Sequence, residues 1–74
     1  MTHADTIQLL DVVALTSDCP DKGLLRGQVG TVVEKLAPGV FEVEFSDDQG
    51  RTYAQAALGE GQLLILRYQP QQAA

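Results

Sequence analysis

The stretch Arg26–Phe45, RGQVGTVVEKLAPGVFEVEF, decides the fold of this chain because it predicts a tight β-hairpin. Apolar residues alternate with glutamates through Phe41–Phe45, and this period of two gives a strand one buried face and one solvated face. Upstream, Val29–Val33 is rich in β-branched residues, which suit a pleated surface better than a helix. Pro38 presets the backbone of a turn between the two runs, and Gly39 accepts the positive φ that follows. The expected strands are Val29–Leu36 and Val40–Phe45.

Three further strands are expected at Ile7–Leu15, Arg51–Leu58 and Leu63–Leu66. The first carries Asp11 as its only charge, so we expect a central strand with both faces mostly covered. In the second, Tyr53, Gln55 and Ala57 should share one face, although a helix remains an alternative for this segment. Gly59–Gly61 should form a single 3-10 turn before the last strand.

Turn-forming residues mark the connections between these strands. The longest loop is expected at Thr16–Gly27, and a short turn at Asp47–Gly50. Gly27 and Gly30 predict a bulge or a close approach of two backbones where the hairpin begins. Five short strands joined in this way predict an all-β fold, a small five-stranded SH3-like barrel whose two sheets pack nearly at right angles.

The length of 74 residues permits one small core, so we expect one domain. The barrel should span 7–68, after a flexible start at 1–6 and before a disordered tail at 69–74. Cys19 is the only cysteine, which excludes an internal disulfide and fits a reducing cytoplasm. The chain has neither an export signal nor an apolar run of the roughly 20 residues that cross a bilayer, so we expect a cytoplasmic protein without a membrane partner.

Several stretches resemble a family of short bacterial proteins of unknown function. They are DVVAL from Asp11, GLLRGQVGTVVE from Gly23, APGVFEVEF from Ala37, DxxGRTYA from Asp47 and QLLIL from Gln62. The resemblance spans about residues 7–66 and implies an SH3-like barrel without agreed catalytic residues. Members of that family look like small partners encoded beside toxin-type proteins, which implies immunity or antitoxin work. More distantly, Arg26–Val32 resembles the glycine-centred hairpin of ribosomal and transcription-factor barrels, a short motif that barrels of unrelated function share.

The chain is acidic, with a net charge of −5 from ten acidic and five basic residues. A protein that neutralises phosphates needs the opposite balance, so nucleic-acid binding is disfavoured. An acidic surface could instead mimic a phosphate backbone or attract a basic partner. Its candidate residues are Asp18, Asp21, Glu42, Glu44, Asp47 and Asp48. The simpler alternative is a solvated face that keeps the barrel soluble and its edges unpaired.

Residues suited to metal binding or catalysis are few. His3 is the only histidine and Cys19 has no neighbouring base, so neither a transition-metal site nor a catalytic thiol is expected. The Asp47–Gly50 stretch lacks the full alternating set of oxygen ligands found in calcium loops. Glu42 and Glu44 lie on a solvated strand face, whereas acid catalysis by a carboxyl group needs a shielded position. We therefore expect that this protein is not an enzyme and binds no cofactor.

The sequence favours a non-catalytic protein-interaction module, of the kind that neutralises a toxin-type protein or serves as an accessory subunit of a larger partner. The residues expected to contact the partner are Asp18, Asp21, Asp47, Asp48, Arg51 and Tyr53. Tyr53 offers a large contact area with a polar end, although it could simply cover one mouth of the barrel. The alternative function is an RNA- or ribosome-associated barrel. Leu63–Leu66 could also form an edge that pairs with a second copy, giving a homodimer.

Overall fold

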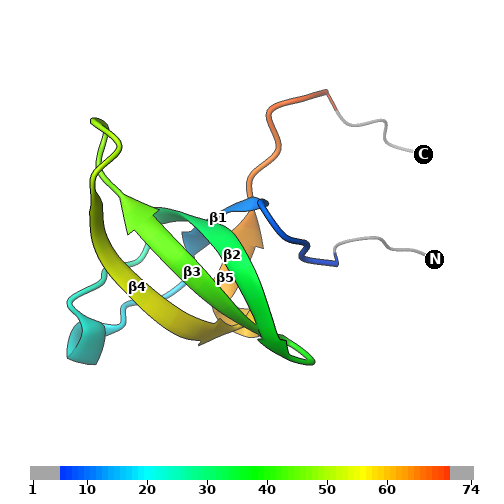
Figure 1. The fold of residues 1–74 in the computed structure, drawn as a ribbon, viewed down its shortest axis with the longest axis horizontal. Coiled ribbons are helices and arrows are strands. Elements are labelled where there is room, and N and C mark those ends of the chain that lie inside the picture. Colours follow the sequence, from blue (N-terminus) through cyan, green and yellow to red (C-terminus); the bar gives the residue numbers. More distant parts are fainter. Residues whose placement is uncertain (1–5, 71–74) are drawn as a thin grey trace.

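The computed structural model describes residues 6–70, which form one antiparallel sheet of five strands. In chain order the elements are β1 (Val12–Leu15), η1 (Pro20–Lys22), β2 (Val29–Ala37), β3 (Val40–Ser46), β4 (Thr52–Gly59), η2 (Glu60–Gln62) and β5 (Leu63–Ile65), where η marks a 3-10 turn. The strand order is β4-β3-β2-β1-β5, so β1 to β4 pair in sequence and β5 returns beside β1 (Figure 1). The prediction of an all-β, five-stranded SH3-like barrel with a 3-10 turn before the last strand is confirmed.

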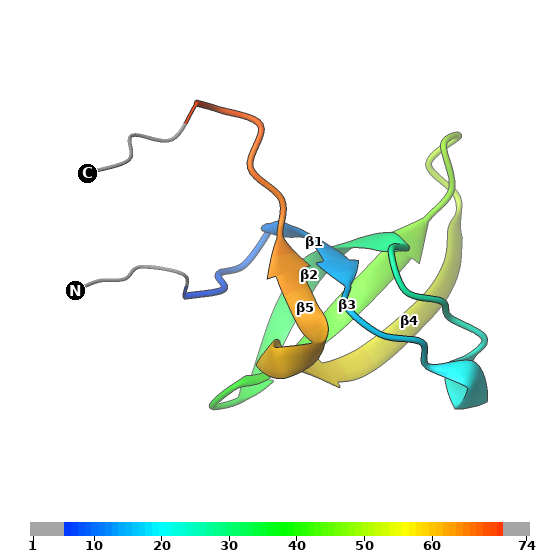
Figure 2. The same cartoon turned by 180° about the vertical axis from the view of Figure 1, so that it is seen from behind.

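The long strand β2 joins the two halves of the barrel. Its first residues pair with β1, and the strand pairs with β3 along most of its length. Two register shifts interrupt the β2–β3 ladder, one between Val32 and Glu34 and one between Lys35 and Ala37. Bulges of this kind bend a strand and increase its twist. The two separate sheets expected from the sequence are therefore the two halves of one continuous, curved sheet (Figures 1 and 2).

The core lies on the concave face of the sheet. Its largest fully buried side chains are Val13, Leu24, Val32, Val43, Phe45 and Leu58. No polar or charged side chain among residues 6–70 is buried with them. Removal of this apolar surface from water is the main stabilising term available to so small a domain.

The hairpin that decides the fold has the predicted register. Phe41, Val43 and Phe45 are buried, while Glu42 and Glu44 between them remain partly exposed. Gly39 has φ 73°, as the turn after Pro38 requires. Gly30 is paired with Val13 on one side and Phe45 on the other. A Cβ atom at Gly30 would lie 2.6 Å from Val43 Cγ1, so the predicted close approach of two strands is confirmed.

The prediction for the first strand was too long, because only Val12–Leu15 of Ile7–Leu15 is a strand. The preceding residues form a turn in which the Gln8 N–H donates to Asp11 Oδ2 and the Asp11 N–H donates to the Gln8 carbonyl. Leu10 adopts φ 71° and its N–H donates to the Val32 carbonyl, the arrangement of a bulge with a left-handed first residue. Leucine rarely adopts this conformation, so the apolar pattern concealed the turn. The strand was predicted to be central, and this is correct, because β1 lies between β2 and β5.

The β3–β4 turn and the long loop lie where the sequence predicts them. The segment after Asp47–Gly50 is a strand, so the helical alternative for it is wrong. Gly50 closes the turn with φ 82° and donates its N–H to the Asp47 carbonyl. The long loop is more ordered than expected, because it contains η1 and a bridge between the buried residues Cys19 and Leu24. These two side chains anchor the loop to the core.

Residues 1–5 and 71–74 lie outside the described part of the chain. The predicted flexible start and disordered tail fall mostly on these residues, and so does His3. Within residues 6–70, no helix has the length and apolar character needed to cross a membrane.

Candidate functional site

An exposed apolar row crosses the outer face of β2, β1 and β5. Val29 pairs with Ala14, and Ala14 pairs with Leu64, so the three side chains lie side by side on the face turned away from the core. Leu64 is 57% exposed and Val29 is 44% exposed, whereas Ala14 between them is only 9% exposed. We call these three residues the outer apolar row. The next positions along the same face are Thr31 and Val12, which pair with each other.

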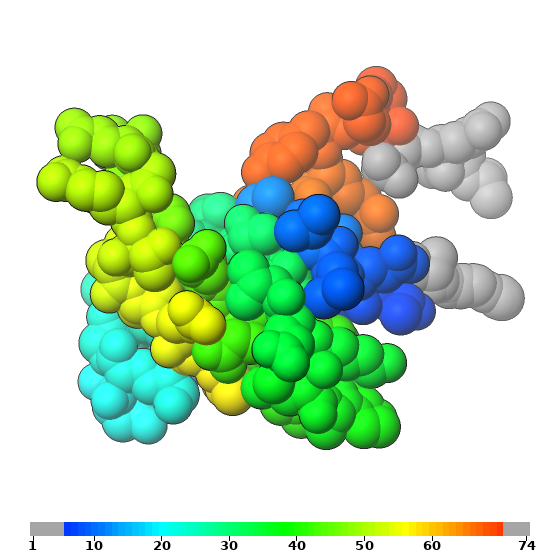
Figure 3. Space-filling model, viewed as in Figure 1, coloured from blue at the N-terminus to red at the C-terminus, as the bar shows by residue number. Residues whose placement is uncertain are grey.

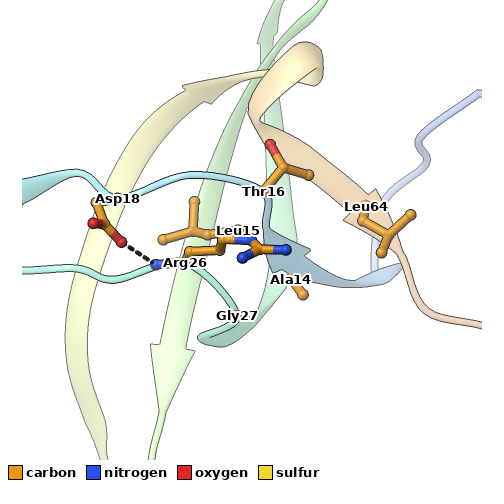
Figure 4. Close-up of a pocket in the computed structure, with 7 residues that line it drawn as sticks. All are labelled: Ala14, Leu15, Thr16, Asp18, Arg26, Gly27 and Leu64. Atoms are coloured by element: carbon orange, nitrogen blue, oxygen red, sulfur yellow. Dashed lines mark hydrogen bonds between the residues drawn. The ribbon is translucent and has the colours of Figure 1, made fainter.

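A shallow hollow of about 610 Å³ opens beside this row (Figure 4). Its lining comes from β1, β5 and both ends of the long loop: Ala14, Leu15, Thr16, Asp18, Arg26, Gly27 and Leu64. The hollow therefore combines two members of the apolar row with one cation and one carboxylate. Such a mixture of an apolar floor and a polar rim is typical of protein interfaces.

Backbone hydrogen bonds fix Arg26 at the rim of the hollow. Its N–H donates to Asp18 Oδ1 at 2.8 Å, and the next residue, Gly27, donates its N–H to the Leu15 carbonyl at 2.8 Å. The Arg26 side chain extends toward Ala14 and Leu64 (Figure 4). In the described part of the chain its guanidinium makes no ion pair or hydrogen bond. It keeps five N–H donors available to a partner.

Asp47 and Arg51, both predicted to contact a partner, stabilise the β3–β4 turn. Asp47 Oδ1 accepts the N–H groups of Gln49 and Arg51 at 2.9 Å each, and Arg51 Nε lies 3.4 Å from Asp47 Oδ2. The hydrogen bond from the Arg51 backbone, followed by that from Gln49, lowers the pKa of Asp47 below its ordinary value of 3.8. The turn, which also holds Asp48, projects from the body of the barrel (Figures 1 and 3).

The other predicted contact residues lie elsewhere. Tyr53 is the second residue of β4, with half of its surface exposed. Its ring lies 6.3 Å from that of Phe45, and its hydroxyl accepts a hydrogen bond from Gln28 Nε2. Asp18 shapes the long loop through Arg26, and Asp21 lies exposed in η1. Since η1 and the β3–β4 turn lie well apart in Figures 1 and 2, the six predicted residues do not form one surface. Their contribution to binding stays a prediction.

The acidic residues of the hairpin form a patch on the outer face of β2 and β3. Glu34 lies directly opposite Glu42, and Glu44 follows on the same face of β3. We call these three residues the acidic patch. Without the bulge between Val32 and Glu34, Glu34 would point into the core opposite Phe41. No ion pair offsets the patch within residues 6–70.

The basic residues come from separate segments. Lys22 lies in η1, Lys35 near the end of β2, Arg51 in the β3–β4 turn and Arg67 after β5. These segments lie at different corners of the barrel in both ribbon views (Figures 1 and 2). Among the basic residues, Arg26 is therefore the one that lines the hollow.

Groups suited to metal binding do not gather in the described residues, where no three of His, Cys, Asp and Glu could hold an ion together. The buried Cys19 thiol accepts a hydrogen bond from Gln62 Nε2 at 3.5 Å and helps to tie the long loop to η2.

Sequence reasoning missed the hollow because its parts are far apart in the chain. Ala14 and Leu64 belong to uniformly apolar strands, so no alternation showed which side chains face outward. Arg26 was visible only as one of five scattered cations. The pairing of β5 with β1 brings these residues together, and that pairing depends on the whole fold.

The sequence model described as "Domain of unknown function (DUF4926)" matches residues 9–65. The chain belongs to this family. The DUF4926 match covers every strand from β1 to β5, so the family domain coincides with the barrel. The resemblance to a family of unknown function is thereby confirmed, whereas its link to toxin-type neighbours and to ribosomal barrels stays a prediction. No curated protein and no solved structure matches this DUF4926 domain.

Proposed function

We propose that this DUF4926 domain is a non-catalytic protein-interaction module whose partner covers the outer apolar row and the hollow beside it. The observation that carries the proposal is the exposure of Leu64 and Val29 next to an Arg26 guanidinium without a partner in the described chain. Apolar side chains in register across three strands, two of them exposed, give an interface centre, and an arginine at the rim adds directional hydrogen bonds.

The partner chemistry follows from the site. An apolar side chain of the partner would fill the hollow over Ala14, while a neighbouring carboxylate would meet Arg26. A neutraliser of a toxin-type protein, or an accessory subunit, would act by covering a functional surface of that partner. The barrel needs no conformational change for this role, because Arg26 and the row are held by backbone hydrogen bonds and strand pairing.

The experiment begins with capture of partners by the tagged full chain from its native cells at low salt, in nuclease-treated and untreated halves. The protein recovered in stoichiometric amount is then purified, and its affinity is measured by calorimetry for Leu64→Thr, Arg26→Gln and Leu36→Thr. Leu36 is a matched control, since it is 46% exposed but lies near the β2–β3 turn, away from the row.

We expect Leu64→Thr and Arg26→Gln each to weaken binding at least roughly tenfold, while Leu36→Thr binds like the wild type. Equal affinity for all three variants would overturn the assignment of the surface. Recovery of ribosomal or RNA-bound proteins only in the untreated half would favour the nucleic-acid alternative instead.

A further inference from the structure

The edge strand β4 carries neither charge nor proline to prevent pairing with another chain, and a bulge interrupts its ladder with β3 only at Tyr53. Within residues 6–70 it ends the sheet, pairs only with β3, and has no strand beyond it (Figures 1 and 2). Its eight residues, TYAQAALG, include no charge and no proline, although the whole chain carries a net charge of −5. Natural edge strands are commonly guarded by lysine, proline or inward-pointing charge. After that bulge the uncharged edge from Ala54 to Gly59 keeps a regular register, and such an edge is a template for strand addition.

The ladder shows which backbone groups of β4 face outward. The Glu60 N–H donates to the Gly39 carbonyl at 2.9 Å, so Glu60 is a hydrogen-bonded position opposite β3. Because such positions alternate along an antiparallel strand, Leu58, Ala56 and Ala54 also bond to β3. Gln55 and Ala57 therefore direct their N–H and C=O groups away from the sheet. The Gly59 N–H also points outward, but Gln62 Oε1 accepts it at 2.9 Å.

We propose that two copies of this chain pair antiparallel through the exposed edges of β4, about a two-fold axis at Ala56. Gln55 of each copy would then lie opposite Ala57 of the other, and their outward groups would form four N–H···O=C hydrogen bonds. The half-exposed Tyr53, at the bulge, would lie near Gly59 of the second copy, where an aromatic ring finds room beside a residue without a side chain.

The charges at the two ends of β4 favour a second copy in antiparallel orientation. Arg51, whose exposed guanidinium also pairs with Asp47, precedes the strand, and Glu60 follows it. Antiparallel self-pairing brings each Arg51 beside Glu60 of the other copy, and this happens twice because of the two-fold symmetry. Parallel pairing would instead place like charges together. The sequence-based suggestion of an edge at β5 is less favourable, because β5 has only three residues and its Leu63 N–H already donates to the Glu60 carbonyl.

This dimer is independent of the proposed function. The outer apolar row lies on β2, β1 and β5, at the opposite side of the strand order from β4. A dimer through β4 therefore leaves both rows exposed and presents two binding sites related by symmetry. If the proposed function is correct as well, one dimer binds two partner molecules.

The test is sedimentation velocity of the full chain over a wide range of concentrations. We expect the weight-average mass to rise toward twice the 8.0 kDa of one chain. Ala57→Pro removes one outward N–H per copy and should raise the dissociation constant roughly tenfold or more. Proline is tolerated on an edge strand where its missing N–H faces outward. Ala57→Thr keeps the N–H group and should dimerise like the wild type.

A charge exchange keeps the proposal testable if proline disturbs the strand. Glu60→Arg places like charges together across the two-fold axis and should weaken dimerisation, while Arg51→Glu with Glu60→Arg restores opposite charges and should recover it. Circular dichroism establishes that each variant is folded. A wild-type mass that stays at 8.0 kDa at the highest concentration, or a double exchange that fails to recover dimerisation lost in the single variant, would overturn the proposal.

Discussion

The two outer faces of this sheet share β2 but differ in character. The face over β2, β1 and β5 carries the outer apolar row, whereas the face over β2 and β3 carries the acidic patch. The side chains buried on the inner surface of both halves are all apolar within residues 6–70 and belong to one core. The core that stabilises the fold is therefore built from inner side chains alone. The acidic patch shows that an outer face of this sheet can carry charged residues. The exposed leucine and valine of the row are not needed for the core, which is why we assign them to a partner.

The largest expected effect separates the inner from the outer surface within one strand. Val43 is fully buried, so Val43→Asp places an unpaired charge in the core and should cost about 4 kcal/mol or more, comparable to the whole stability of so small a domain. Glu44→Lys, one residue along and partly exposed, should change stability by less than about 0.5 kcal/mol. Circular dichroism with urea denaturation measures both. Equal effects would mean that the strand register is wrong.

The next largest loss of stability is expected at Gly30, where the two halves of the barrel meet. Gly30→Ala places a Cβ atom 2.6 Å from Val43 Cγ1 and 2.9 Å from the Glu44 carbonyl oxygen, so we expect a loss of about 1–3 kcal/mol. Gly61→Ala is the matched control, because open space surrounds that position and its φ is not positive. Urea denaturation should show the control within about 0.5 kcal/mol of wild type. A harmless Gly30→Ala would contradict the close approach of β2 and β3.

A smaller effect tests the acidic patch. Glu34 and Glu42 are directly opposite like charges, so Glu34→Lys should replace repulsion by attraction and stabilise the fold by about 0.2–1 kcal/mol. The gain should shrink at high salt, because the side chains are exposed or partly exposed. Urea denaturation at two ionic strengths measures it. A loss of stability that salt does not alter would mean that Glu34 points elsewhere.

The smallest expected effect concerns the acidic turn outside both faces. The pKa of Asp47 is lowered by the backbone N–H groups of Arg51 and Gln49, so its ionised form favours the folded state. This contribution is complete above the ordinary value of 3.8 and is lost as the pH falls through the lower folded-state pKa. Asp47→Asn should therefore reduce the loss of thermal stability that the wild type shows on acidification in this window. Identical acid profiles for the two proteins would exclude the contribution.

The hairpin could be predicted from sequence because its information is local. Alternation in Phe41–Phe45 and the turn residues Pro38 and Gly39 determine two strands and their faces without reference to the rest of the chain. The extent of β1 could not be predicted, since Leu10 adopts a conformation that leucine rarely takes.

The candidate site was less accessible to sequence reasoning than the fold. The outward position of Glu34 depends on a bulge, and a one-residue shift reverses the face of every side chain that follows. The hollow depends on strand pairing between the two ends of the chain, which brings Leu64 beside Ala14. Asp47 was predicted to contact a partner, and its Oδ1 accepts backbone N–H groups of the turn that contains it.

The most direct test of the account is the affinity of Leu64→Thr for the isolated partner, measured beside Leu36→Thr together with the stability of both variants. We predict that both variants unfold at nearly the wild-type urea concentration, because both side chains are largely exposed. We also predict that only Leu64→Thr loses affinity, at least roughly tenfold. Wild-type affinity for Leu64→Thr, or a loss of affinity that accompanies an equal loss of stability, would contradict the claim that the outer apolar row is a binding surface.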